Sequence, residues 1–208
     1  MAVVITVAQQ KGGTGKTTLA ANLAAALAPV RRVAVLDIDP QKSLTRWIAL
    51  RANAPQAAAL TFSEVSGWRL SAELDRLKRT HDVLLIDSPP QIDTDARLAI
   101  RGADLVLVPV QPSPPDVWAA EGTLKLAAAE RRPARLLLNR MPPASRLGET
   151  VKADLVARGL PLLRASVGNR TGFAIAFAVG LGVTEAAPRS TAAAELRAVL
   201  EELRELTE

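Results

Sequence analysis

Residues 3–19 read V-V-I-T-V-A-Q-Q-K-G-G-T-G-K-T-T-L, and this stretch decides the fold. It opens with a short apolar, β-prone run, continues through a glycine loop, and passes into alanines and leucines at helical spacing, which predicts strand, loop and helix. Glycines let successive backbone N–H groups turn inward, and the following helix adds the positive end of its dipole. The loop is therefore predicted to hold a chain of phosphates. Its glycines are Gly12, Gly13 and Gly15.

The loop nearly matches the P-loop pattern G-x-x-x-x-G-K-[ST]. A match places Lys16 at the β- and γ-phosphates of ATP and the Thr17 hydroxyl on Mg²⁺. The first glycine of the pattern falls at Gln10, and Lys11 follows it. The string K-G-G-T-G-K-T-T resembles the deviant Walker A loop of the ParA/MinD family of P-loop ATPases, in which the early lysine crosses a dimer interface to the partner's nucleotide. The resemblance implies that Lys11 acts in trans, and that the nucleotide loop comprises Lys11, Gly12, Gly13, Thr14, Gly15, Lys16, Thr17 and Thr18.

The remainder of the chain continues the alternation of strands and helices. A helix predicted over 17–28 ends at a proline, and a buried strand follows over 32–37. This βαβ unit requires parallel strands. We therefore predict an α/β fold of the P-loop NTPase type, with a mostly parallel, twisted sheet and helices on both faces. Further strands are predicted over 82–87, 104–110, 134–139 and 160–166, and further helices over 43–52 and 191–207.

Leucines at positions 70, 74 and 77 predict one more amphipathic helix, packed on the sheet. Trp68 lies just before them. Because a large aromatic residue beside such a pattern usually contributes to the core, we predict that Trp68 is buried.

Carboxylates follow the strand over 32–37, where α/β folds place their ligands. The segment over 37–43, D-I-D-P-Q-K-S, resembles the D-x-D-P-Q-x-S element of the ParA branch. The resemblance implies that Asp39 orients or activates the attacking water, and that Asp37 stabilises the loop and the Mg²⁺ shell. The alternative interpretation is that Asp39 and Pro40 form only a turn and a helix cap.

Other strand ends carry motifs of the same family. Residues 82–90, D-V-L-L-I-D-S-P-P, resemble a Walker B strand with the family's D-x-P-P, so Asp87 is predicted to hold Mg²⁺. In the family, the asparagine at the place of Asn139 hydrogen-bonds the adenine edge, a task that suits an amide. Residues 109–116 resemble the P-V-x-P-S-x-x-D segment at the nucleotide and dimer face. Asp116 and Trp118 equally fit a helix cap and a core anchor.

Composition narrows the class of protein. With 208 residues, 49% of them hydrophobic, the chain is predicted to form a single P-loop ATPase domain over residues 1–208. It has no apolar run of the ~20 residues that span a membrane and no signal segment, so a cytoplasmic protein is expected. The absence of cysteine excludes disulfides, thiolate metal sites and the relatives that bind iron–sulfur clusters. The absence of tyrosine argues against the related bacterial tyrosine kinases.

The net charge of +5 favours a polyanionic partner. Residues 131–170 hold nine basic residues against two acidic ones, so the positive charge is concentrated in this part of the sequence. Three arginines match the family's DNA-contacting region: Arg164, Arg170 and Arg189. The closing helix and the residue after it, over 191–208, carry five glutamates and two arginines. A MinD-like anchor needs a basic polar face to lie on anionic lipid, so no membrane partner is expected.

The resemblance covers the whole chain and implies a small ParA-type ATPase. Its cofactors would be ATP and Mg²⁺, and its basal hydrolysis of ATP would be weak. The implied cycle comprises an ATP-bound homodimer, nonspecific DNA binding over the nucleoid, and hydrolysis stimulated by a ParB-like or other cargo adaptor. The cargo would be a plasmid, a chromosome region or a protein cluster. The alternatives are a MinD-like membrane-positioning ATPase and a P-loop metabolic ligase of the dethiobiotin-synthetase type.

Overall fold

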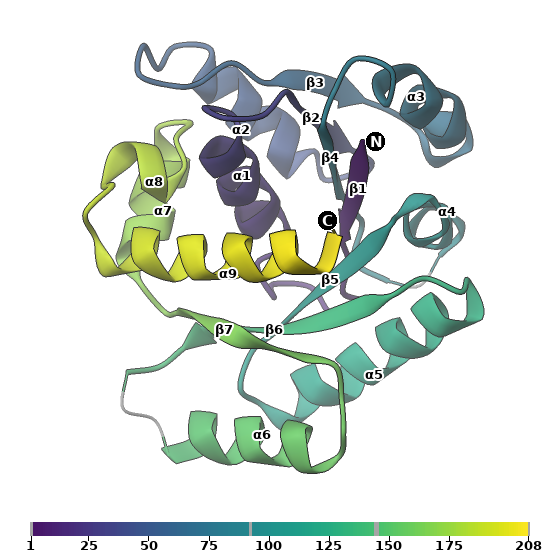
Figure 1. Cartoon of the computed structure of the whole chain (residues 1–208), viewed down its shortest axis with the longest axis vertical. Helices are drawn as coiled ribbons and strands as arrows, with labels where there is room; N and C mark the ends of the chain where they lie inside the picture. Colours follow the sequence, from purple (N-terminus) through teal and green to yellow (C-terminus); the bar gives the residue numbers. More distant parts are fainter. Residues whose placement is uncertain (1, 92, 144–145, 208) are drawn as a thin grey trace.

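The computed structural model describes residues 2–91, 93–143 and 146–207. Its strands form one seven-stranded sheet in the order β3-β2-β4-β1-β5-β6-β7, and all neighbouring strands run parallel (Figure 1). The predicted α/β fold of the P-loop type is confirmed. The strands are β1 (Val3–Val7), β2 (Val33–Asp37), β3 (Thr61–Glu64), β4 (Val83–Asp87), β5 (Leu105–Val110), β6 (Ala134–Met141) and β7 (Leu162–Gly168).

Helices cover both faces of this sheet. Those on one face are α1 (Lys16–Leu27), α2 (Ser43–Arg51), α7 (Thr171–Ala178), α8 (Val183–Ala186) and α9 (Thr191–Thr207). Those on the other face are α3 (Leu70–Leu77), α4 (Thr94–Gly102), α5 (Pro114–Ala129) and α6 (Arg146–Ala157). None of the helices within the described ranges is long and apolar enough to cross a bilayer.

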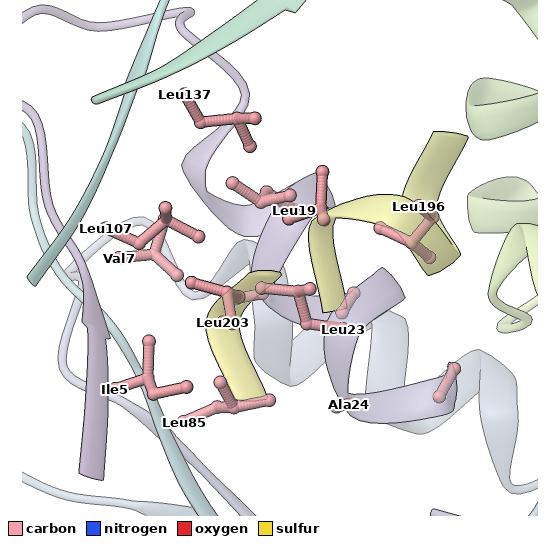
Figure 2. Close-up of a cluster of buried hydrophobic side chains, with 14 of the residues drawn as sticks. Ile5, Val7, Leu19, Leu23, Ala24, Leu85, Leu107, Leu137, Leu196 and Leu203 are labelled. Carbon is pink, nitrogen blue, oxygen red and sulfur yellow. The ribbon is translucent and has the colours of Figure 1, made fainter. Parts of the chain in front are cut away.

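The core explains why the central strand is rigid. Side chains alternate along β1: Ile5 and Val7 pack under α1 and α9, whereas Val4 packs against α3 and α4. Figure 2 shows the first of these clusters, in which leucines of α1 and α9 meet those of the strands. Burying each such side chain stabilises the fold by about 1.5–3 kcal/mol. Because β1 is buried on both faces, the glycine loop that follows it starts from a fixed point.

Several features differ from the sequence-based predictions, which gave no ranges for α4, α5, α6, α7 and α8. β3 was not predicted, because it has only four half-buried or exposed residues, lies at the sheet edge and lacks an apolar run. The prediction that Trp68 is buried is wrong: the residue is 73% exposed, in a short 3₁₀ turn (Gly67–Arg69) ahead of α3. The leucines of α3 fill the core, while the Arg69 guanidinium covers the Trp68 ring at 4.4 Å. The other predicted strands and helices agree with the structure to within two residues at each end.

Candidate nucleotide-binding site

The glycine loop connects Val7, the last residue of β1, to Lys16, the first residue of α1. Gly13 and Gly15 have φ angles of 78° and 94°, in the left-handed region that side-chain-bearing residues rarely adopt. A Cβ atom on Gly15 would also lie 2.7 Å from Nδ2 of Asn139. Both glycines are therefore required by the shape of the loop.

Asn139 lies in β6 and supports the loop from the side. Its Nδ2 donates a hydrogen bond of 2.8 Å to the carbonyl oxygen of Thr14. The side chain is buried and also lines a pocket beside the loop. The sequence did not predict this hydrogen bond between Asn139 and the loop. The contact of Asn139 with adenine stays a prediction.

Two pockets adjoin the loop and share Gly15, Thr18 and Arg140. The first has a volume of about 280 Å³, and Lys16, Thr17 and Asp39 are among its lining residues. The second, of about 300 Å³, lies between α1, the end of β6 and the start of α7. Its walls include more apolar groups, among them Val167 and Phe173. This division suits phosphates in the first pocket and a nucleoside in the second.

Asp87 ends β4, and the sheet register places it between Val7 of β1 and Asp37 of β2. It is fully buried, and neither of its carboxylate oxygens has a hydrogen-bond partner among the described residues. A buried carboxylate without partners is costly. Mg²⁺ binds through one or two carboxylates together with substrate phosphates, so Asp87, with the Thr17 hydroxyl nearby, fits such an ion.

The first pocket brings together a buried ammonium and buried carboxylates, and burial shifts the pKa of both kinds of group. Burial raises the pKa of Asp87 to about 7, and the carboxylates of Asp37 and Asp39 add to the rise, while Thr17 and Lys16 oppose it. Burial also lowers the pKa of Lys16, against the attraction of Asp87 and Asp39. A phosphate chain with Mg²⁺ would supply an anion for the ammonium and a cation for the carboxylates.

Asp39 lines the first pocket from the loop between β2 and α2. Its Oδ1 accepts a hydrogen bond of 2.9 Å from the backbone N–H of Gln41. Asp37 holds this loop from behind, because its Oδ1 accepts the Asp39 N–H at 3.1 Å and its Oδ2 accepts the backbone N–H and hydroxyl of Thr45. The structure thus places Asp39 at the first pocket, and it gives Thr45 a supporting contact that the sequence did not predict.

Comparison with known proteins identifies the family. A family model described as the CobQ/CobB/MinD/ParA nucleotide binding domain matches residues 5–183. Two relatives are named maintenance of carboxysome distribution protein A: that of Halothiobacillus neapolitanus is 31% identical over 97% of this chain and 96% of its own length, and that of Gloeobacter kilaueensis is 35% identical over 96% and 93%. A solved complex of Cyanothece McdA with ATP superposes with a TM-score of 0.82 at 21% identity, covering 98% of this chain and 96% of that one. The chain belongs to the CobQ/CobB/MinD/ParA family.

Lys11 is the residue at which the ParA/MinD resemblance makes its most specific prediction. In the single chain, its Nζ forms an ion pair with Asp116, which is almost completely buried in the first turn of α5. Oδ2 of Asp116 also accepts a hydrogen bond of 2.6 Å from the hydroxyl of Ser113. Since Lys11 is 41% exposed, its ammonium lies at the rim of the site rather than in its interior.

The structure corrects the alternative interpretation of this segment. Ser113, and not Asp116, is the N-cap of α5, so Asp116 is not the helix cap. Trp118 is not a core anchor, because it is 66% exposed. Asp116 instead holds Lys11, and Trp118 is displayed on the surface two residues away.

Two glutamines also tie α5 and its preceding loop to the glycine loop. Nε2 of Gln10 donates to the carbonyl of Ala119 at 2.8 Å, and Nε2 of Gln111 donates to the carbonyl of Gly13 at 2.9 Å. Sequence reasoning missed both contacts. The sequence did mark Gln10 as unusual, because it occupies the position of the first P-loop glycine. In the structure, Gly122 leaves room for the Gln10 amide.

The three arginines predicted to contact DNA all lie near α9. Arg164, in the edge strand β7, pairs with Glu202 and Glu205, the latter at 2.6 Å. Arg170, before α7, pairs with Glu195 at 2.5 Å and also lines the second pocket. Arg189 is exposed in the turn before α9. Glutamates of the closing helix therefore partly neutralise this region, and DNA contact by these arginines stays a prediction.

Proposed function

We propose that the chain is a ParA-like ATPase of one domain that hydrolyses ATP to ADP and phosphate with Mg²⁺. Its basal turnover is slow, it forms an ATP-bound homodimer, and it distributes a cargo over nonspecific DNA. A ParB-like or other cargo adaptor stimulates hydrolysis. In this proposal the protein is cytoplasmic and associated with the nucleoid.

One observation carries the proposal: Lys16, Thr17 and Asp39 line a single pocket under the glycine loop. Lys16 supplies the charge that binds the polyphosphate, and Thr17 with Asp87 would hold Mg²⁺. Asp39 is fixed through its Oδ1 and its backbone N–H, and its carboxylate would orient the attacking water. These are the parts that phosphoryl transfer to water requires, because it depends mainly on positioning and charge stabilisation.

The position of Lys11 supports the proposed dimer. A lysine within its own phosphate pocket would be a second cis ligand, whereas Lys11 lies at the rim and is held by Asp116. In the proposed dimer, the ammonium exchanges Asp116 for the phosphates bound to the partner. This exchange would couple dimer formation to ATP.

The relatives favour a protein assembly as the cargo. Two relatives that align with nearly the whole chain are named for carboxysome distribution. A protein cluster is therefore the preferred cargo in this proposal, ahead of a plasmid or a chromosome region. The adaptor would be a protein bound to that cluster.

The membrane-positioning alternative is disfavoured by α9. A helix that lies on lipid must expose its apolar face. The apolar residues of α9, including Leu196, Val199 and Leu203, are buried against the sheet and α1. The metabolic ligase would need a place for a second substrate, and nucleotide alone would account for both pockets beside the loop.

A direct test measures phosphate release, DNA retardation and vesicle pelleting with the same protein and Mg²⁺-ATP. The proposal predicts slow phosphate release that Lys16→Ala abolishes, ATP-dependent retardation of a random duplex, and no pelleting with anionic vesicles. ATP-dependent pelleting without retardation would instead identify a membrane-positioning ATPase. Failure to release phosphate from ATP under any of these conditions would refute the proposed activity.

A further inference from the structure

Arg140 lies near the end of β6, where the two pockets beside the glycine loop meet. Together with Gly15 and Thr18, it lines both pockets. Its side chain reaches the loop, because a Cβ atom on Gly15 would lie 4.0 Å from Nε of Arg140. The residue is exposed, so its guanidinium is accessible at the boundary between the pockets.

The backbone of β6 is irregular at this residue. Consecutive side chains of a regular strand point to opposite faces of a sheet, yet Asn139 and Arg140 both line the second pocket. Arg140 has a φ of 53°, in the left-handed region, and the pairing of β6 with β7 shifts in register between Leu138 and Met141. Such an irregularity redirects a side chain, which accounts for the position of Arg140 beside Asn139.

The left-handed conformation of Arg140 is not explained by a helix end. Arg131 has nearly the same φ, 55°, but it follows α5, where a left-handed residue commonly ends a helix. Arg140 lies within a strand, and this conformation is unfavourable for a residue with a Cβ atom. Strained residues of this kind cluster at binding sites. The backbone therefore favours a role for Arg140 toward a ligand.

The guanidinium of Arg140 is also left without an acidic partner. Among the residues that the structure describes, its side chain takes part in no ion pair or hydrogen bond. Arg170, which lines the second pocket as well, is instead paired with Glu195. A planar guanidinium suits phosphate oxygens, with which it forms charge-assisted hydrogen bonds. Arg140 is thus available to an anionic group of a ligand.

The order of the pockets indicates which anionic group this is. The β- and γ-phosphates belong at Lys16 in the first pocket, and the second pocket suits the nucleoside. The α-phosphate joins these parts of a nucleotide, so it must lie at the boundary between the pockets. Thr18 lies there too, in the first turn of α1, where the first N–H bonded within the helix is that of Leu19. The earlier N–H groups are free to bind an anion.

We propose that Arg140 binds the α-phosphate of the nucleotide through its guanidinium. The inference rests on the proposed nucleotide site and names a contact there that the sequence did not predict. ATP and ADP both carry an α-phosphate, so Arg140 would stabilise the two complexes to the same extent. This role differs from that of Asp39, whose proposed task is to orient the attacking water.

The test is isothermal titration of ATP and of ADP, each with Mg²⁺, into the parent, Arg140→Ala and Arg140→Lys. Titrations at about 50 mM and about 500 mM salt measure how far the contact is screened. Arg131→Ala is the matched control, because it removes an exposed arginine of the same backbone conformation that lines neither pocket. Thermal melting establishes that the variants are folded.

We expect Arg140→Ala to bind ATP and ADP about 10-fold more weakly at low salt, and the control to bind both like the parent. The loss should shrink at high salt, and Arg140→Lys should recover part of the affinity, because an ammonium still pairs with phosphate.

Equal affinities of Arg140→Ala and the parent would overturn the inference. A loss confined to ATP would overturn it in favour of a γ-phosphate contact. A loss that neither salt nor Arg140→Lys reduces would overturn it in favour of stacking on the base. If the parent itself binds neither ATP nor ADP, the proposed nucleotide site fails, a result distinct from equal binding by parent and variant.

Discussion

The two ends of the strands carry charge in opposite ways. At the carboxyl ends, Lys16 and Asp39 are buried and line a pocket, and the fully buried Asp87 interacts electrostatically with both. At the amino ends, Lys78 and Arg79, in the turn before β4, are exposed to solvent. A buried charge is costly unless a partner or ligand compensates it, so its presence specifies chemistry. An exposed charge costs little and acts mainly through its sum with others. Single substitutions should therefore have large effects at the carboxyl ends and small ones at the amino ends.

The largest difference is expected between two Lys→Ala variants. Lys16→Ala should weaken ATP binding by a factor of about 10² or more, because the polyphosphate loses its principal buried counter-charge. Lys78→Ala, in the turn before β4, should leave ATP affinity unchanged. Isothermal titration with ATP measures both. Equal affinities in the two variants would remove Lys16 from the nucleotide site.

The next effect concerns turnover and not binding. Asp39→Ala should retain ATP, while phosphate release falls by a factor on the order of 10² through loss of water positioning. Asp75→Ala, which removes an exposed carboxylate of α3, is the control and should hydrolyse ATP normally. If Asp39→Ala turns over at the parent rate, the role moves to another group, with Asp37 the first candidate.

Substitution of Lys11 tests whether a residue at the rim of the pocket acts in dimerisation and not in ATP binding. Lys11→Ala should still bind ATP, yet it should lose ATP-dependent dimerisation and partner-stimulated turnover. Asp116→Asn should have a milder effect, because it weakens the hold on Lys11 but leaves the lysine available. Analytical ultracentrifugation with ATP and with ADP measures the dimer. Dimerisation of Lys11→Ala at parental ATP concentrations would show that Lys11 is an ordinary loop residue.

The last effect is a dependence of stability on pH. Burial raises the pKa of Asp87 from its ordinary 3.8 to about 7, so the folded state favours the protonated carboxyl. This contribution to the free energy of unfolding is fully present below about pH 4 and is lost as the pH rises to about 7, by at most about 1.4 kcal/mol per pH unit. At the amino ends Arg32 lowers the pKa of Asp82, so that pair weakens only in acid.

Urea unfolding without Mg²⁺ or nucleotide at pH 5, 6, 7 and 8 measures this term. The difference between the parent and Asp87→Asn isolates the contribution of one carboxylate, because the amide does not titrate. The parent should lose stability relative to the variant as the pH rises to about 7. A constant difference across the series would show that Asp87 keeps its ordinary pKa.

The sequence predicted the carboxyl-end site more fully than it predicted its surroundings. The glycine loop, Asp39 and Asp87 were predicted to lie at this edge because an apolar strand followed by a short motif is a local pattern. The contacts of Thr45 and Gln111 were missed, because a hydrogen bond between groups that are separated in the sequence produces no local sequence pattern. The ion pair of Lys11 with Asp116 joins residues 105 positions apart and was likewise not predictable.

The incorrect predictions about the fold have a similar cause. β3 is stabilised as a strand by its hydrogen bonds to β2 at the sheet edge, and its own sequence has no apolar pattern. Trp68 was predicted to be buried from its position beside the leucines of α3, but the 3₁₀ turn directs the indole outward.

The central claim is that ATP, held at the carboxyl ends, joins two chains. Light scattering coupled to size exclusion with the Asp39→Ala protein tests it directly, since this variant should bind ATP without consuming it. With Mg²⁺-ATP we predict twice the mass of one chain, and with Mg²⁺-ADP the mass of a single chain. A single-chain mass at an ATP concentration that titration shows to be saturating would contradict the account.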